Sequence, residues 1–157
     1  MSTQNVSKKT TILDLQKAKT AGERIASLTA YDAGFATVLD NAGVDFILVG
    51  DSLGMAVQGR ETTIPVTVEE MIYHTQLVVR GTKRAMVMAD MPFMSYSSAH
   101  DCMQNAARLM KEGGAEIVKL EWGALEISMV SRLTDCGIPV CAHLGLTPQA
   151  IHKFGAY

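Results

Sequence analysis

The chain has 157 residues, of which 48% are hydrophobic and 19% are charged, and its formal net charge at pH 7 is −2. These values are typical of a globular domain with a buried core and exclude a disordered chain. Because no run of like charges occurs, we expect neither nucleic acid nor a membrane surface as a partner. A small anionic substrate stays compatible with this balance, since a binding site depends on only a few side chains.

The cysteines and the first residues indicate the cellular compartment. Cys102, Cys136 and Cys141 are odd in number and lack C-x-x-C spacing, which favours reduced thiols in the cytosol. Residues 1–20 are polar and mixed in charge, and the chain has no run of about 18 apolar residues. We therefore expect a cytoplasmic protein whose residues 1–157 form a single domain, with an N-terminal extension or helix at 1–20.

Strands and helices are predicted to alternate from residue 24 onward. Short apolar runs, typical of strands in a buried parallel sheet, lie at 24–30, 45–50, 84–90, 116–122 and 138–145. Helices are predicted at about 33–43, 67–81, 98–113 and 125–134, and apolar residues at helical spacing support those at 67–81 and 98–113. The clearest helix begins with the capping box Thr67-Val68-Glu69-Glu70. Consecutive βα units of this kind build a parallel sheet.

Two architectures contain such units: an open doubly wound sheet and a (β/α)8 TIM barrel. The sequence has neither a G-x-G-x-x-G motif after the first strand nor a P-loop, which argues against a nucleotide-binding open sheet. A complete barrel takes about 250 residues. We therefore expect an α/β fold that is a TIM barrel truncated after about five strands.

Charged or titratable side chains lie at the end of each expected strand. They are Asp32, Asp51, Asp90, the pair Lys119 and Glu121, and His143. Lys119 and Glu121 are two residues apart and therefore face the same side of the sheet. In a barrel, such side chains gather at the carboxyl ends of the strands, where active sites lie. Mg²⁺ requires oxygen ligands and often takes one or two carboxylates, so Asp51 and Asp90 are the predicted ligands, and Gly50 allows close approach.

Seven motifs occur in the order and spacing of one protein family. They are VGDSLGM (49–55), QG (58–59), T-x-P-V-T (63–67), Y-H-T (73–75), AD-x-PFM (89–94), VK-x-E (118–121) and HLGLTPQ (143–149). From about Thr11 to Tyr157 the chain resembles the ketopantoate hydroxymethyltransferases, also called 3-methyl-2-oxobutanoate hydroxymethyltransferases. The resemblance implies a Mg²⁺-dependent TIM barrel of the phosphoenolpyruvate/pyruvate superfamily that assembles as a cytoplasmic homodecamer and serves pantothenate biosynthesis.

The resemblance also implies a reaction and a set of site residues. The reaction transfers a hydroxymethyl group from 5,10-methylenetetrahydrofolate to 3-methyl-2-oxobutanoate, giving 2-dehydropantoate (ketopantoate) through a Mg-stabilised enolate. Asp51 and Asp90 resemble the metal ligands, and Glu121 resembles a further acid at the metal, directly or through water. The residues that would bind the ketoacid are Asp51, Ser52, Asp90 and Lys119.

The general base of the family is a glutamate that the resemblance places beyond Tyr157, so no residue of this sequence is assigned to that role. We therefore expect the 157-residue chain alone to exchange the C3 proton of 3-methyl-2-oxobutanoate no faster than buffer containing Mg²⁺. Trp122 stands where the family usually has a small residue. It would either narrow the mouth of the pocket or pack against a neighbour.

Several alternatives stay open at this point. Asp32 is either a helix cap or a functional residue, Lys119 and Glu121 are either ligand-binding or a plain ion pair, and His143 is either structural or close to the substrate. Two other functions also fit the elements. One is a Mg²⁺-dependent carbon–carbon lyase or mutase of the same superfamily, although the K-K-C-G-H-type loop common in those enzymes does not occur here. The other is an inactive truncated barrel module.

Overall fold

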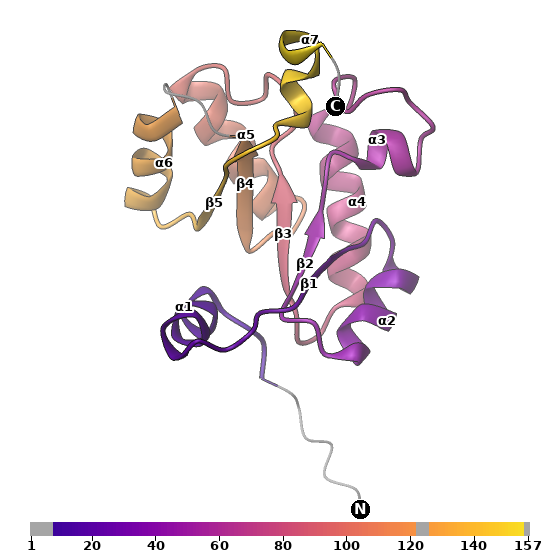
Figure 1. Cartoon of the computed structure of the whole chain (residues 1–157), viewed down its shortest axis with the longest axis vertical. Helices are drawn as coiled ribbons and strands as arrows, with labels where there is room; N and C mark the ends of the chain where they lie inside the picture. The colour runs from indigo at the N-terminus through magenta and orange to yellow at the C-terminus, as the bar shows by residue number, and fades with distance from the viewer. Residues whose placement is uncertain (1–7, 122–125, 156–157) are drawn as a thin grey trace, which may run out of the picture.

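The centre of the computed structural model, which describes residues 8–121 and 126–155, is a parallel sheet of five strands (Figure 1). The strands are β1 (Ser27–Thr29), β2 (Phe46–Val49), β3 (Met86–Asp90), β4 (Ile117–Glu121) and β5 (Val140–His143). Each strand pairs in parallel with the one before it in the chain, so the spatial order is β1-β2-β3-β4-β5. A doubly wound sheet reverses its strand order at a switch point, whereas this sheet winds in one direction, as a barrel does. The barrel prediction is confirmed over these five strands.

Four long helices follow the first four strands. They are α2 (Ala33–Ala42), α4 (Val68–Gly81), α5 (Ala99–Lys111) and α6 (Glu126–Asp135). All four were predicted, and apolar spacing supported α4 and α5. The capping box at Thr67 forms as expected, since the Thr67 side chain accepts from the Glu70 backbone N–H and the Glu70 side chain accepts from the Thr67 backbone N–H. Asp32 caps α2 by accepting the Phe35 backbone N–H at 2.9 Å, which confirms the capping alternative for this residue.

Further elements lie at the two ends of the sheet (Figure 1). Helix α1 (Ile12–Ala21) lies where the strands begin and covers part of the segment expected to be an N-terminal extension or helix. Helices α3 (Leu53–Ala56) and α7 (Ile151–Phe154) lie at the opposite end, where the strands finish, and the 3-10 turn η1 (Pro148–Ala150) leads directly into α7. These three elements were not predicted, because three or four residues are too few to show a helical period.

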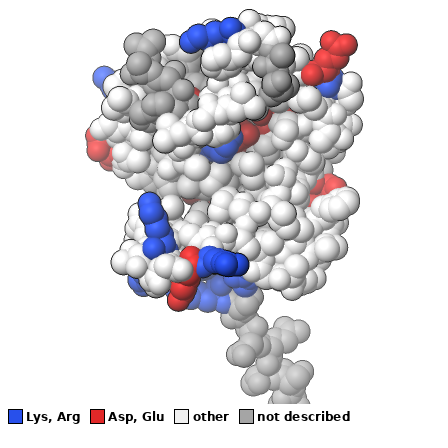
Figure 2. Space-filling model, viewed as in Figure 1, with Lys and Arg blue, Asp and Glu red and all other residues white. Residues whose placement is uncertain are grey.

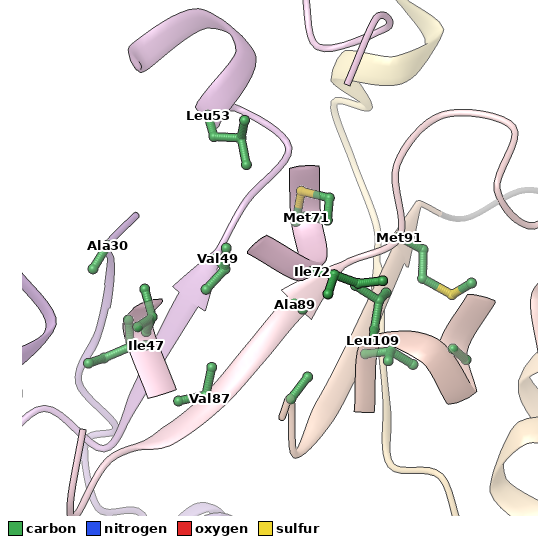
Figure 3. Packing of buried hydrophobic residues seen from close by; sticks show 14 of the residues in the cluster. Ala30, Ile47, Val49, Leu53, Met71, Ile72, Val87, Ala89, Met91 and Leu109 are labelled. Atoms are coloured by element: carbon green, nitrogen blue, oxygen red, sulfur yellow. The ribbon is translucent and has the colours of Figure 1, made fainter. Parts of the chain in front are cut away.

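The two faces of the sheet carry two separate hydrophobic clusters. Alternate residues of a strand point to opposite faces. Ile47 and Val49 of β2 belong to the larger cluster, which packs against the helices, and Figure 3 shows residues of β2 and β3 in this cluster near Met71 and Ile72 of α4. The smaller cluster, on the barrel-interior face, contains residues of β2, β3, β4 and β5, and α1 covers it: Met86, Met88, Ile117, Phe46, Leu48, Cys141, Ile12 and Leu15. Burial on both faces explains why the central strands β2, β3 and β4 are almost continuously apolar.

The smaller cluster ends before the carboxyl ends of the strands, where polar residues begin. On β3, β4 and β5 the positions that continue this interior face toward the carboxyl ends are polar, namely Asp90, Lys119, Glu121 and His143. The barrel interior therefore changes from apolar to charged along the strand direction. Trp122, whose role was left open, lies outside the described residues. Among the helices that the structure describes, none combines the length and apolarity needed to cross a bilayer.

Candidate functional site

Strand register places four polar side chains next to one another at the carboxyl end of the sheet. Asp90 of β3 pairs with Lys119 of β4, and Glu121 of β4 pairs with His143 of β5. Asp51 follows β2 after Gly50, and its backbone N–H donates to Asp90 Oδ2 at 3.2 Å. Asp51, Asp90 and Glu121 are all buried, with exposed fractions of 4%, 4% and 8%. The acids predicted from separate strands therefore converge on one buried site.

Lys119 supplies the positive charge of this site. Its Nζ donates to Asp90 Oδ1 at 2.5 Å, and both side chains are largely buried. The ion pair of Lys119 is therefore with Asp90 on the neighbouring strand, and the simple Lys119–Glu121 pair that the sequence left open is not the arrangement found. The difference arises because residues two apart on one strand point the same way, whereas register brings Asp90 directly opposite Lys119.

The site holds more negative charge than its own cation balances. Burial and the nearby charge of Asp90 raise the pKa of Asp51 to about 6. Burial, followed by the charges of Asp51 and Asp90, raises the pKa of Glu121 to about 7, although the Gln149 backbone N–H opposes the rise. Burial also raises the pKa of Asp90 against the lowering effect of Lys119. A bound divalent cation would remove this imbalance.

The donor set matches the chemistry of Mg²⁺. This ion takes carboxylate oxygens from one or two protein side chains and keeps other positions for water and substrate. Asp51 and Asp90 are hard oxygen donors in direct contact through the Asp51 backbone. Over residues 8–121 and 126–155, no three His, Cys, Asp or Glu side chains are arranged to hold an ion by themselves. The site therefore fits a cation that takes two carboxylates and completes its coordination with other oxygen ligands.

The turn after β2 places Ser52 beside the acids. Ser52 Oγ lies 2.8 Å from the Tyr31 hydroxyl. A Cβ atom on Gly50 would lie 2.7 Å from Ser52 Oγ and 3.4 Å from Asp90 Oδ2. Gly50 therefore leaves the space that Ser52 and Asp90 occupy. The close approach of a ligand expected at Gly50 stays a prediction, since the neighbours found there are the chain's own side chains.

His143 lies beside Glu121 at the end of β5. Its Nδ1 is 3.8 Å from Glu121 Oε1, and the side chain is 31% exposed. Within the part of the chain that the structure describes, this buried Nδ1 atom has no hydrogen-bond partner. His143 is thus brought to the site, as the sequence allowed, whereas Asp32 is held in its helix cap and takes no part.

Gln149 is a site residue that sequence reasoning did not assign. Its side-chain Nε2 donates to Asp51 Oδ2 at 2.7 Å, and its backbone N–H donates to Glu121 Oε2 at 3.1 Å. The only sequence signal was the motif HLGLTPQ, which ends on this residue. Tyr31, the partner of Ser52, was also missed.

In the same view as Figure 1, Figure 2 shows basic and acidic surface side by side in a recess in the upper half of the molecule, the half in which the strands end.

Solved structures share the fold at low sequence identity. One is 2,3-dimethylmalate lyase, a PEP mutase/isocitrate lyase superfamily member, with a TM-score of 0.60, 15% identity, and coverage of 83% of this chain and 51% of that chain. Another is phosphoenolpyruvate phosphomutase from Streptomyces platensis subsp. rosaceus, with a TM-score of 0.57, 21% identity, and coverage of 68% of this chain and 36% of that chain. At this identity the likeness concerns the fold alone. It agrees with the truncated TIM-barrel fold over the matched residues and gives no support to a lyase or mutase activity.

Curated relatives are much more similar in sequence. The 3-methyl-2-oxobutanoate hydroxymethyltransferase of Alkalilimnicola ehrlichii is 59% identical over 147 residues, which cover 94% of this chain and 53% of the relative. That of Halorhodospira halophila is 56% identical, with 94% of this chain and 54% of the relative covered. The chain thus spans about half the length of the curated relatives it matches. The family model for ketopantoate hydroxymethyltransferase matches residues 9–157, and the chain therefore belongs to the ketopantoate hydroxymethyltransferase family.

Proposed function

We propose that this chain carries the metal and ketoacid site of a 3-methyl-2-oxobutanoate hydroxymethyltransferase. The enzyme would transfer a hydroxymethyl group from 5,10-methylenetetrahydrofolate to 3-methyl-2-oxobutanoate and form 2-dehydropantoate for pantothenate biosynthesis. The observation that carries the proposal is the convergence of Asp51, Asp90 and Glu121, with Lys119, at one end of a parallel sheet. The family match supports the substrate and the reaction.

Asp51 and Asp90 would hold Mg²⁺, with Glu121 binding it directly or through water. The fit rests on buried carboxylates whose charge exceeds that of Lys119. When bound, Mg²⁺ supplies Lewis acidity toward the oxygens of the ketoacid, which is worth several kcal/mol on developing negative charge.

The other residues would bind and orient the substrate. The Lys119 ammonium would attract the ketoacid carboxylate, because a buried cation interacts strongly with an anion in a site that excludes water. Ser52 Oγ would donate to a substrate oxygen while its contact with Tyr31 holds its position. The glutamate that the resemblance places beyond Tyr157 would take the C3 proton, and the reaction would then proceed through the enolate of the ketoacid.

The remaining parts of the proposal follow from family membership. The folate co-substrate, the cytoplasmic location and the homodecamer are expected for this chain because its relatives are hydroxymethyltransferases of the same family. We expect no nucleic acid and no membrane among its partners.

Calorimetric titration with 3-methyl-2-oxobutanoate tests the ketoacid site in the chain itself. We expect binding that requires Mg²⁺ and that disappears in Asp51→Asn. In the same samples, the C3 proton should wash out into deuterium oxide no faster than in buffer with Mg²⁺, because no base is assigned within these residues. Equal binding with and without Mg²⁺ contradicts the proposed site, and rapid washout contradicts the assignment of the base.

A graft tests the transfer reaction. Residues 9–157 would replace the matching segment of the Alkalilimnicola ehrlichii relative, to which they are closely similar. The hybrid is expected to form 2-dehydropantoate from the two substrates, and the same hybrid with Asp51→Asn is the control. A folded hybrid that binds Mg²⁺ and forms no product contradicts the proposed reaction.

A further inference from the structure

Gln149 occupies a central place among the loops at the carboxyl end of the sheet. It lies in η1 and is 6% exposed. Its side-chain Nε2 donates to Asp51 Oδ2 at 2.7 Å and to the Met91 carbonyl at 2.9 Å, and its Oε1 accepts from the Tyr96 hydroxyl at 2.5 Å. Because the Met91 carbonyl can only accept, the amide orientation is determined. Both N–H hydrogens and the oxygen of this amide are thus engaged.

The backbone of Gln149 reaches a second acid. Its N–H donates to Glu121 Oε2 at 3.1 Å. A single residue after β5 therefore contacts Asp51, which follows β2, and Glu121, which ends β4. The Asp51 carboxylate is restrained in its rotation about the Cβ–Cγ bond, because one of its oxygens is tied to a buried amide.

The uncharged character of the amide matters for what the site can bind. Lys119 neutralises part of the acid charge, whereas Gln149 donates hydrogen bonds and adds no positive charge. It orients two carboxylates and leaves their charge to attract a cation. A lysine or arginine in its place would compete with a bound cation, and a glutamate would add repulsion against Asp51. Hydrogen bonds from such outer residues typically orient metal ligands.

We propose that Gln149 is a positioning residue of the cation site, which holds Asp51 and Glu121 in the orientation that binds Mg²⁺ by closing η1 over the carboxyl ends of β2 and β4. This inference rests on the proposed function, because it takes Mg²⁺ as the ligand of the acids. It assigns to Gln149 no contact with the substrate and no part in proton transfer.

Calorimetric titration of the 157-residue chain with MgCl₂ tests the inference. Gln149→Met keeps the length of the side chain and removes the amide, and we expect it to weaken Mg²⁺ binding by about 10 to 100-fold. Gln149→Asn, one methylene shorter, is expected to give a similar loss. The matched control is Gln76→Met, which removes an exposed amide that donates to the Glu112 carbonyl on the helical layer. It should leave Mg²⁺ affinity unchanged. Melting temperatures without Mg²⁺ show that each variant is folded.

A measurement without metal keeps the inference testable if the variants do not fold. Hydrogen exchange of side-chain amides by NMR should be at least about tenfold slower for Gln149 than for Gln76, because only the former is buried and fully hydrogen-bonded. Equal exchange rates would overturn the inference. A folded Gln149→Met variant that binds Mg²⁺ as tightly as the original chain would also overturn it and leave the proposed function intact. Absence of Mg²⁺ binding by the original chain would instead overturn the proposed function, and the inference with it.

Discussion

The two ends of the sheet hold carboxylates that are almost equally buried but whose pKa values are shifted in opposite directions. Asp40, at the end where β3 begins, is 9% exposed, and Glu121, at the end where β4 finishes, is 8% exposed. Burial acts to raise the pKa of Asp40, but the backbone N–H groups of residues 83–85 together lower it below its usual value. The pKa of Glu121 is raised to about 7 by burial and by the charges of Asp51 and Asp90.

The difference lies in the donors that the fold supplies. At the amino end, Asp40 accepts hydrogen bonds at 2.7 to 3.2 Å from three consecutive backbone N–H groups. The Arg84 guanidinium there donates to the Val44 carbonyl and lies 3.8 Å from Asp45. At the carboxyl end, buried acids outnumber the cation that pairs with them. The acids at the amino end are satisfied by donors of the fold, while those at the carboxyl end keep an excess of negative charge at the edge where barrel active sites lie.

The largest expected effect is the loss of Asp40. In Asp40→Ala the three backbone N–H groups that it accepts are left unsatisfied, at about 1–3 kcal/mol each. We therefore expect the free energy of unfolding to fall by at least about 3 kcal/mol, measured by urea denaturation. The control is Asp135→Ala on the exposed end of α6, which should change stability by less than about 0.5 kcal/mol. A loss of similar size in both variants would remove the contrast between the two ends.

The pH dependence of stability should reveal the acids at the other end. Asp51 and Glu121 have folded pKa values of about 6 and about 7, above their usual values. At a pH between the unfolded and the folded pKa of each acid, the folded chain binds more protons than the unfolded chain. The free energy of unfolding therefore falls as the pH rises from 5 to 8. Over this range Asp51 alone would contribute a loss of about 1 kcal/mol, because part of its effect falls below pH 5. Acids with lowered pKa values, such as Asp40, are already ionised over this range.

Urea denaturation at pH 5 and pH 8, with and without Mg²⁺, measures this effect. Mg²⁺ should stabilise the chain more at pH 8 than at pH 5, because protonated carboxylates do not bind the ion. Asp51→Asn serves as the control and should reduce the pH dependence to the part that Glu121 contributes, since the amide does not titrate. Stability that rises steadily from pH 5 to pH 8 in the original chain would contradict the raised pKa values.

Much of the site at the carboxyl end could be predicted from the sequence, because side chains alternate between the two faces of a strand and because functional residues of a barrel lie where strands end. Asp90, Lys119 and Glu121 lie on strands whose alternation predicts their shared face, and Asp51 follows a strand directly. Parallel strands bring such residues to one edge whatever the details of packing. The four long helices were also predictable, and α4 and α5 show a repeated apolar spacing with a start or stop signal.

The remaining features of the site depend on tertiary contacts, which the spacing of residues within one strand or helix does not predict. Gln149 reaches Asp51 from 98 residues away through a turn of only three residues. Tyr31 meets Ser52 because two loops from neighbouring strands lie side by side. The pairing of Lys119 with Asp90 required the strand register, which the amino-acid pattern of a single strand does not specify. The strand expected at residues 24–30 shortens to Ser27–Thr29 at the edge of the sheet.

Substitution of the two proposed metal ligands should separate metal binding from stability. We expect Asp51→Asn and Asp90→Asn to weaken Mg²⁺ binding by at least about 100-fold, or about 2.7 kcal/mol, while the fold persists. Calorimetry gives the affinity, and circular dichroism at pH 8 gives the melting temperature without metal. Asp51→Asn should melt no lower than the original chain, because it removes a buried charge. Near-normal Mg²⁺ affinity in either variant would remove that residue from the site.

The smallest expected effect concerns Tyr31, and it tests whether ketoacid and metal binding can be separated at this end of the sheet. Its hydroxyl contacts Ser52 Oγ at 2.8 Å, while its backbone carbonyl accepts from His74 Nδ1 at 2.8 Å. Tyr31→Phe therefore removes the contact with Ser52 and keeps the backbone anchored. We expect ketoacid binding to weaken about fivefold, since a neutral hydrogen bond contributes about 1 kcal/mol.

Mg²⁺ affinity should stay unchanged in Tyr31→Phe. Among the hydrogen bonds of the described residues, Tyr31 contacts Ser52, which is proposed to bind the ketoacid, and it contacts neither Asp51 nor Asp90, which are proposed to bind the metal. Tyr73→Phe, on the exposed side of α4, is the matched control and should alter neither affinity. Titrations with Mg²⁺ alone, and with ketoacid at saturating Mg²⁺, give the two constants. An equal loss of both affinities would show that the turn after β2 acts as one unit. A loss confined to the ketoacid would show that Ser52 and Asp51, adjacent in sequence, serve different ligands because different loops hold them.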